Sequence, residues 1–287
     1  MIWSTSRFSI DLSQPRVMGI VNATPDSFSD GGTYFGGADK FAGAFAHCDK
    51  LLKDGADMLD IGGESTRPGS PAVSLNDELA RVIPVVREAV RLGVPLSIDT
   101  YKHEVMQAVL DLGADIINDI WALRQPGARE VVARHPSCGV CLMHMHREPQ
   151  TMQALPMEGD VVAQVLAFLT DAAAQLQKVG VGKDRIVLDA GVGFGKTVAQ
   201  NFALLARQRD FAATGYPVLA AWSRKSSLAA VSGVLPADAA PMNAADRLVP
   251  SVAAALLAVE RGARVVRVHD VRETVQALKV WKAASAD

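Results

Sequence analysis

The sequence has few cysteines, no long apolar run and almost no net charge, and each shortage excludes a class of protein. Only three of its 287 residues are cysteines, which cannot all pair with one another, so we expect a reducing, cytoplasmic setting. No stretch approaches the roughly 18 apolar residues of a membrane-spanning helix, so we expect no membrane segment. Residues 1–16 lack the cationic start and apolar core of a secretory signal.

The net charge of −2 gives no general electrostatic basis for binding nucleic acid or an anionic membrane, so any anion site has to be local. Apolar residues make up 49% of the chain and charged residues 21%, which is typical of a globular enzyme. The length suits one large α/β domain or two small ones. No linker or low-complexity segment divides the chain, so we expect a single domain over residues 1–287.

Short β-rich runs alternate with amphipathic stretches along the whole chain. The runs are mostly continuous apolar residues, as in strands covered on both faces. Eight strand-then-helix units predict a closed (β/α)8 TIM barrel, with an open doubly wound sheet as the alternative. Ser74 or Asn76 is expected to cap the second helix, and Pro250 to lie inside the seventh and kink it. The expected strands are 17–22, 58–63, 95–99, 116–120, 139–144, 185–190, 217–223 and 264–270.

A polar residue stands at the end of each expected strand. Taken singly, an aspartate in this position is more often a helix cap than a functional group. A barrel, however, gathers the carboxyl ends of all its strands around one mouth, so the set predicts one polar active site there. The set is Asn22, Asp60, Glu64, Asp99, Asn118, Asp119, His144, Asp189, Ser223, Lys225, His269 and Asp270.

Cations in the loops after the strands favour an anionic ligand. Arg67 lies in one loop and the pair Arg224 and Lys225 in another, while Arg267 and His269 are two apart and share one strand face. Such groups beside glycine loops suit a phosphate or pyrophosphate. The competing interpretation is that the loop arginines are solvated surface charges.

The stretch VLDAGVGFGKT, residues 187–197, resembles a phosphate loop except that Ala190 stands where the first glycine belongs. In that interpretation Lys196 reaches phosphates. Alanine resists the tight turn that the motif needs, so the phosphate loop is the less favoured interpretation. The stretch CGVCLMHMH, residues 138–146, resembles a metal or redox site. Successive residues of a strand point to opposite faces, which separates Cys141 from His144. We therefore interpret Cys141 as strand core and His144 as a packed histidine rather than a zinc ligand.

Eight segments in order are similar to those of the dihydropteroate synthases, over about residues 9–282. The resemblance implies a (β/α)8 barrel that condenses 6-hydroxymethyl-7,8-dihydropterin pyrophosphate with p-aminobenzoate, giving 7,8-dihydropteroate and pyrophosphate. It also implies Mg2+, a homodimer, and competition between sulfonamides and p-aminobenzoate. The segments are MGIVNATPDSFSDGG (18–32), DIGGESTRPG (60–69), SIDT (97–100), IINDI (116–120), CLMHM (141–145), DAGVGFGK (189–196), SRKS (223–226) and RVHDV (267–271).

The resemblance also implies a role for each matching residue. Catalytic roles fall to Asn22, Arg67, Asp99, Lys225, Arg267 and His269, and Mg2+ bridges Asn22 and phosphate. The pterin ring is bound by Asp99, Asn118, Met143, Asp189 and Lys225, with Asp189 accepting from the flat donor pair of the ring. Pyrophosphate is bound by Asn22, Arg67, Arg267 and His269. The p-aminobenzoate wall consists of Phe28, Thr66, Pro68, Phe194 and Ser226.

The chain departs from the usual pattern of this family at Ala23, Ala190, Val192, Ala221 and Trp222, and none of these changes removes a hydrogen-bonding group of the expected site. Two other functions use a similar barrel. A pterin-binding methyltransferase needs no cations for a leaving pyrophosphate, and a non-catalytic homologue is expected to lose the loop residues. The complete loop motifs favour the synthase.

Overall fold

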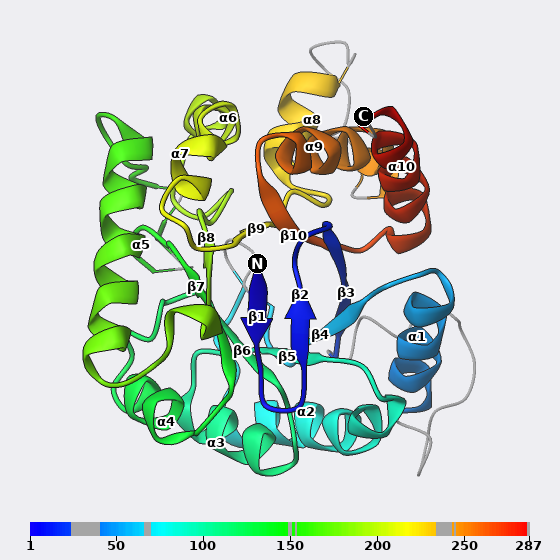
Figure 1. The fold of residues 1–287 in the computed structure, drawn as a ribbon, viewed down its shortest axis with the longest axis vertical. Helices are drawn as coiled ribbons and strands as arrows, with labels where there is room; N and C mark the ends of the chain where they lie inside the picture. Colours follow the sequence, from blue (N-terminus) through cyan, green and yellow to red (C-terminus); the bar gives the residue numbers. More distant parts are fainter. Residues whose placement is uncertain are drawn as a thin grey trace.

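Eight parallel strands close into a barrel in the computed structural model, which describes residues 1–23, 41–65, 70–148, 151–152, 154–233, 243 and 245–285 (Figure 1). The last strand pairs with both the first and the seventh, so the sheet has no edge. The barrel prediction is therefore confirmed, and the open sheet is wrong. The strands are β3 (Arg16–Asn22), β4 (Met58–Gly62), β5 (Leu96–Asp99), β6 (Ile116–Asp119), β7 (Gly139–Met143), β8 (Ile186–Asp189), β9 (Val218–Ala220) and β10 (Ala263–Val268).

Helices surround the barrel and cover the outer faces of its strands, which explains why the strands are apolar on both sides (Figure 1). Short 3-10 turns lie at Val90–Leu92, Lys183–Arg185 and Ala245–Arg247. The helices are α1 (Ala42–Lys53), α2 (Leu75–Ala89), α3 (His103–Asp111), α4 (Ala128–Arg134), α5 (Val161–Lys178), α6 (Val198–Ala206), α7 (Gln208–Ala212), α8 (Ser226–Ser232), α9 (Leu248–Glu260) and α10 (Val271–Ala284).

The helix boundaries confirm some expectations and correct others. Ser74, not Asn76, caps α2, because its side chain accepts the backbone N–H of Asp77. Pro250 is the third residue of α9, in the first turn, where a backbone N–H has no partner within the helix, so no kink is required. The proline inside a helix is instead Pro84 of α2.

An antiparallel hairpin lies across the barrel end where the strands begin, and the strand–helix alternation gave no sign of it (Figure 1). It consists of β1 (Ile2–Ser4) and β2 (Ser9–Asp11). Trp3 is fully buried, and its Nε1 donates to the Arg185 carbonyl at 3.0 Å. With Ile10 and Leu12 it packs on the first inward-facing residues of the strands, so apolar side chains close this end.

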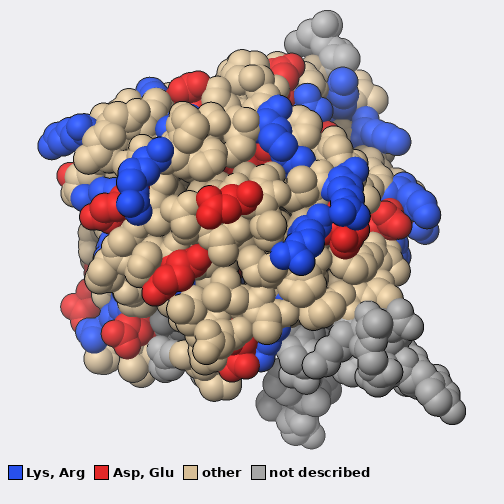
Figure 2. Space-filling model, turned by 90° about the horizontal axis from the view of Figure 1, so that it is seen from below, with Lys and Arg blue, Asp and Glu red and all other residues tan. Residues whose placement is uncertain are grey.

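The face shown in Figure 2 carries lysine, arginine and acidic side chains interspersed over its described part, in keeping with the net charge of −2. Among the described residues, no helix combines the length and the hydropathy needed to cross a membrane.

Candidate active site

The carboxyl ends of the strands open into a cavity of about 440 Å³. Asn22 of β3, Asp99 of β5 and Arg267 of β10 line it, although they are far apart in the sequence. The prediction that strand ends from the whole chain share one pocket is therefore confirmed for these residues. Residues beyond the strand ends complete the lining, and they include Glu64, Ser65, Met152, Phe194, Ser223, Arg224, Lys225, Ser226, Arg247 and His269.

Arg267 lies between two carboxylates inside the barrel. Its Nε is 2.6 Å from Asp60 Oδ2, and its Nη2 is 2.8 Å from Asp99 Oδ2. Burial raises the pKa of Asp99 to about 7. The charge of Arg267 opposes this shift, and the neighbouring carboxylate of Asp60 adds to it. Asp60 is fully buried, and the Asn118 amide lies 3.3 Å from its Oδ2. Asp60 belonged to the expected polar strand-end set but was assigned no ligand, and its contact with Arg267 is what the structure adds.

Asn118, Met143 and Asp189 lie near the ends of three neighbouring strands and are at most 6% exposed. Asn118 is the register partner of Asp99, and Met143 is the partner of Asp189. Asp189 Oδ1 accepts the backbone N–H of Gly191 at 2.8 Å. Burial raises the pKa of Asp189. Of the expected pterin-binding residues, Asp99 and Lys225 line the cavity, whereas Asn118, Met143 and Asp189 are not among its lining residues. Their role in binding the pterin stays a prediction.

The loop after β8 has a backbone that only glycine adopts easily. Gly191, Gly193 and Gly195 have φ values of 67°, 85° and 69°. A Cβ at Gly191 would lie 1.9 Å from the backbone oxygen of His144. This tight path puts Phe194 on the cavity wall, as expected.

Lys196 stabilises that loop and is not among the residues that line the cavity. It is 3% exposed, and its ammonium donates to the backbone oxygens of Gly191 at 2.8 Å, Phe194 at 3.0 Å and His144 at 3.3 Å. Burial lowers its pKa to about 7. The phosphate-loop interpretation is therefore wrong, because the lysine is committed to backbone carbonyls.

Lys225 lies at the mouth of the cavity, directly before α8. Its ammonium is 4.4 Å from the centre of the Phe194 ring, a cation–π contact. Burial lowers the pKa of Lys225 to about 8, while the charge of Asp189 opposes the shift. Ser226, the first residue of α8, also lines the cavity.

Ser223 orients the neighbouring His269. Its hydroxyl accepts the backbone N–H of His269 at 3.1 Å and lies 3.0 Å from the ring Nδ1. Arg224, expected to face an anion together with Lys225, pairs with Asp270 at 2.5 Å. Its left-handed backbone, with φ of 59°, turns the chain at this point. Sequence reasoning missed the role of Ser223 because only the fold brings it to His269.

Several strand-end residues have structural roles. Asp119 accepts the backbone N–H groups of Trp121 and Leu123, both at 2.8 Å, and so shapes the turn after β6. The His144 ring packs edge-on against the Phe168 ring, with 5.0 Å between the ring centres. Burial, with Lys196 and Arg124 nearby, lowers the pKa of His144 to about 2, so the ring stays neutral.

The cysteines and histidines of residues 138–146 lie in separate environments. Cys141 belongs to the apolar cluster under the hairpin, whereas Cys138 contacts the Arg185 guanidinium at 3.3 Å. His146 lies against Gly195. The interpretations of Cys141 as core and of His144 as a packed ring are confirmed. In the ranges given above, no three His, Cys, Asp or Glu side chains form a group that could hold a metal ion.

Four expected residues, Phe28, Thr66, Arg67 and Pro68, lie outside the described residues. Their roles remain predictions. Glu64, Met152 and Arg247 line the cavity without having been assigned a ligand.

Comparison with known proteins shows sequence similarity over nearly the whole chain. Residues 18–269 match the family described as pterin binding enzymes. Dihydropteroate synthase of Neisseria meningitidis serogroup B is 49% identical over 286 residues, which cover 98% of this chain and 97% of that protein.

Two solved structures have the same barrel. Burkholderia cenocepacia dihydropteroate synthase, complexed with 7,8-dihydropteroate, has a TM-score of 0.86 and 50% identity over 99% of this chain and 96% of that one. The Xanthomonas albilineans dihydropteroate synthase, with 4-aminobenzoic acid, has a TM-score of 0.88 and 47% identity over 97% and 96%. The similarity therefore covers barrel and mouth together.

Proposed function

The chain belongs to the dihydropteroate synthase family of pterin-binding enzymes, and from its cavity we propose which residues perform the reaction. The enzyme condenses 6-hydroxymethyl-7,8-dihydropterin pyrophosphate with p-aminobenzoate to 7,8-dihydropteroate and pyrophosphate. The observation that carries the assignment of residues is the convergence of acids, amides and cations on one barrel mouth.

The pterin ring binds deep in the barrel. The Asp189 carboxylate accepts the ring amide N–H and the exocyclic amine together, as carboxylates accept a guanidinium. Asp99 and Asn118 offer further partners, Lys225 donates to the ring acceptors, and Met143 packs on the ring. The strand register supports this assignment, because Asn118 lies beside the cavity-lining Asp99 and Met143 lies beside Asp189. A buried polar set also rejects analogues that leave its groups unpaired.

The pyrophosphate binds where the cavity is cationic, against Asn22, Arg67, Arg267 and His269. Contacts with Asp60 and Asp99 use two of the five N–H donors of Arg267, so three can reach phosphate oxygens. Ser223 fixes the ring of His269 through Nδ1, on the wall of the cavity. Lys196 takes no part, because its ammonium serves backbone oxygens.

Mg2+ suits the donor chemistry of this wall. Mg2+ is usually held by one or two protein oxygens together with substrate phosphates and water. Asn22 provides an amide at the end of β3, on the cavity. The bound ion would neutralise phosphate charge.

The reaction begins with departure of pyrophosphate, which leaves a methylene cation conjugated to the dihydropterin. Electron release from the ring stabilises this cation, and the carboxylates of Asp99 and Asp189 favour the developing positive charge. The arylamine then attacks the methylene carbon and loses its proton. No covalent protein nucleophile is required, so the protein contributes orientation and electrostatics.

The second substrate binds towards the loops. Phe194 packs on the benzene ring, and the backbone N–H of Ser226 receives the carboxylate. Both residues line the cavity. Phe28, Thr66 and Pro68 complete this wall in the proposal.

Pyrophosphate release tests the assignment against the methyltransferase and the non-catalytic homologue. We expect release only with pterin pyrophosphate and p-aminobenzoate together. Arg267→Ala should weaken affinity for the pterin pyrophosphate, whereas Lys196→Ala, the matched loss of a buried cation, should not. Release without the arylamine, or equal effects of the two variants, would contradict the proposal.

A homodimer and a cytoplasmic location complete the proposal. Val231 of α8, Val249 and Leu257 of α9 and Val280 of α10 are exposed by 40–76%, on helices that lie together in Figure 1. Covering such side chains favours association. The three cysteines are free and buried, which suits a reducing compartment. Sedimentation velocity would detect the dimer, and Leu257→Glu should weaken it.

A further inference from the structure

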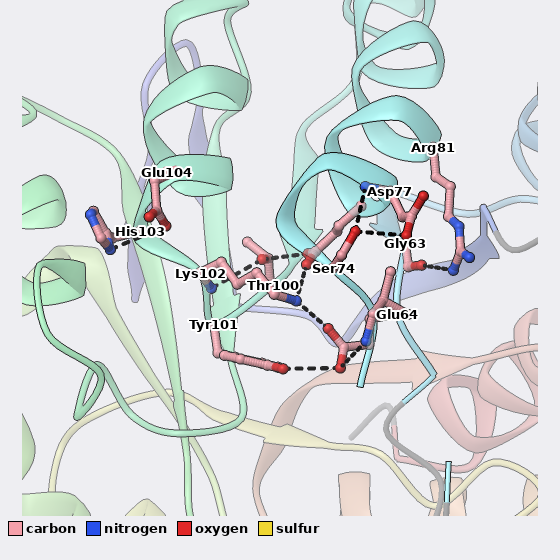
Figure 3. A network of polar contacts seen from close by, with 12 residues as sticks. Gly63, Glu64, Ser74, Asp77, Arg81, Thr100, Tyr101, Lys102, His103 and Glu104 are labelled. Carbon is pink, nitrogen blue, oxygen red and sulfur yellow. Dashed lines mark hydrogen bonds and ion pairs between the residues drawn. The ribbon is translucent and has the colours of Figure 1, made fainter. Parts of the chain in front are cut away.

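The loop from β4 to α2 brings a buried acid to the cavity. Glu64 and Ser65 line the cavity, and the Glu64 side chain is only 9% exposed. Figure 3 shows its carboxylate directed at Tyr101 and Lys102, which follow β5. Neither Tyr101 nor Lys102 is among the residues lining the cavity.

The Glu64 carboxylate joins the two ends of the segment 64–73. Its Oε1 accepts the Tyr101 hydroxyl at 2.9 Å and the backbone N–H of Val73 at 3.3 Å. Its Oε2 accepts the Lys102 ammonium. A second link within the segment joins the hydroxyls of Ser65 and Ser70, 3.1 Å apart. One side chain therefore fixes both ends of the segment to the turn after β5.

Lys102 is itself anchored to α2. Its ammonium lies 2.5 Å from Glu78 Oε2, and Thr100 Oγ1 donates to Glu78 Oε1 at 2.6 Å. Lys102 is 15% exposed and Glu78 1%, so the contact is shielded from water. Burial opposes the charged ammonium, but hydrogen bonds with Glu64 and Glu78 more than offset it and raise the pKa of Lys102. The cation stays charged throughout the physiological range.

The two acids hold different parts of the molecule. Within the described part of the chain, the Glu78 carboxylate accepts hydrogen bonds from Thr100 and Lys102, so it ties α2 to the turn after β5. Glu64 ties the cavity wall to the same turn. If the network is purely structural, loss of either acid should lower stability and leave ligand affinity unchanged. If the network shapes the cavity, loss of Glu64 alone should lower ligand affinity.

We propose that Tyr101 and Lys102 are positioning residues. They hold the Glu64 side chain, and through it they keep Glu64 and Ser65 on the cavity wall and so set the affinity for p-aminobenzoate. The inference rests on the proposed function, which seats that substrate against the loops. The pterin site, built on strand ends, should depend on this network much less.

Glu64→Gln and Glu78→Gln form a matched pair for the test. Each removes one of the two negative charges beside Lys102 and keeps an oxygen that accepts hydrogen bonds. We expect Glu64→Gln to raise the KM for p-aminobenzoate about tenfold, the loss of one charge-assisted hydrogen bond. Its kcat and its KM for pterin pyrophosphate should stay within about twofold. Glu78→Gln should lower Tm and leave both KM values unchanged.

Tyr101→Phe keeps the experiment informative should an acid variant fail to fold, because it removes one hydroxyl and leaves every charge paired. We expect a KM for p-aminobenzoate about threefold higher and an unchanged Tm. Unchanged KM in both Tyr101→Phe and Glu64→Gln, or equal increases for both substrates, would overturn the proposal. Failure of the wild-type enzyme to release pyrophosphate would instead overturn the proposed function itself.

Discussion

The two ends of the barrel are built by the same strands but hold opposite chemistry. Beneath the hairpin, the inward side chains are mainly apolar and contact Trp3. Two residues further along four of these strands, on the same inward face, acids, an amide and a cation appear. Met58 precedes Asp60, Ile116 precedes Asn118, Val187 precedes Asp189, and Val265 precedes Arg267.

The difference teaches how the barrel separates stability from function. A buried charge costs stability unless it is paired, and the raised pKa values of Asp99 and Asp189 and the lowered pKa of Lys225 reflect that cost. At the hairpin end the inward side chains form an apolar cluster, and the fully buried Asp115 is paired with Arg7 at 2.6 Å, so this end stabilises the fold. Changes at the polar end should therefore alter catalysis, and changes at the apolar end should alter stability alone.

Arg267→Met should have the largest effect, because it leaves Asp60 and Asp99 buried together without their cation. Removing one partner of a buried ion pair costs about 3–5 kcal/mol of unfolding free energy. Loss of a phosphate-facing donor should also lower kcat/KM by ~10²-fold or more. Urea denaturation and pyrophosphate release measure the two effects. Arg267→Lys, which keeps the charge, should recover stability more than rate.

Trp3→Ala tests the apolar end. Truncating a fully buried tryptophan should lower the unfolding free energy by about 3–5 kcal/mol. The kcat/KM of the folded protein should not change, because the hairpin lies at the end opposite the cavity. Trp3→Phe, which keeps most of the packing, should cost less. A fall in kcat/KM with full folding retained would show that the two ends are coupled.

Asp189→Asn should weaken pterin binding while sparing stability. Loss of a charge-assisted hydrogen bond predicts a KM for pterin pyrophosphate ~10–100-fold higher. Because folding raises the pKa of Asp189, its contribution to stability is present at low pH and lost as pH rises through the folded pKa. At pH 8 the variant should therefore be at least as stable as the wild type in thermal unfolding. A large drop in Tm would mean that the carboxylate is chiefly structural.

The smallest expected effect is the pH dependence set by Lys225. Burial lowers its pKa to about 8, so the ammonium is charged below that pH and neutral above it. Affinity for the pterin pyrophosphate should therefore fall as pH rises through about 8. Lys225→Arg, whose guanidinium keeps its proton, should move that fall to higher pH. A KM profile from pH 6.5 to 9.5 measures it, and identical profiles would exclude Lys225 as its origin.

Particular residues show how much of the site could be predicted from the sequence. The strand-end positions predicted a place at the mouth for Asn22, Asp99, Lys225 and His269, and all four line the cavity. Arg267, expected from the strand face that it shares with His269, lines it as well. Strand-end positions can be predicted because the alternation of strands and helices is visible in neighbouring residues of the sequence. The clamp of Lys102 on Glu64 was not readable, since it joins residues of two different loops.

The sequence by itself determined the barrel, the polar mouth and the family, because apolar periodicity and ordered motifs are properties of neighbouring residues. Only the tertiary structure decided which cation serves which partner. Lys196 turned inward to backbone oxygens, Arg267 was held between two acids, and the hairpin closed the far end. These outcomes depend on distances between segments far apart in the chain, which local sequence patterns do not encode.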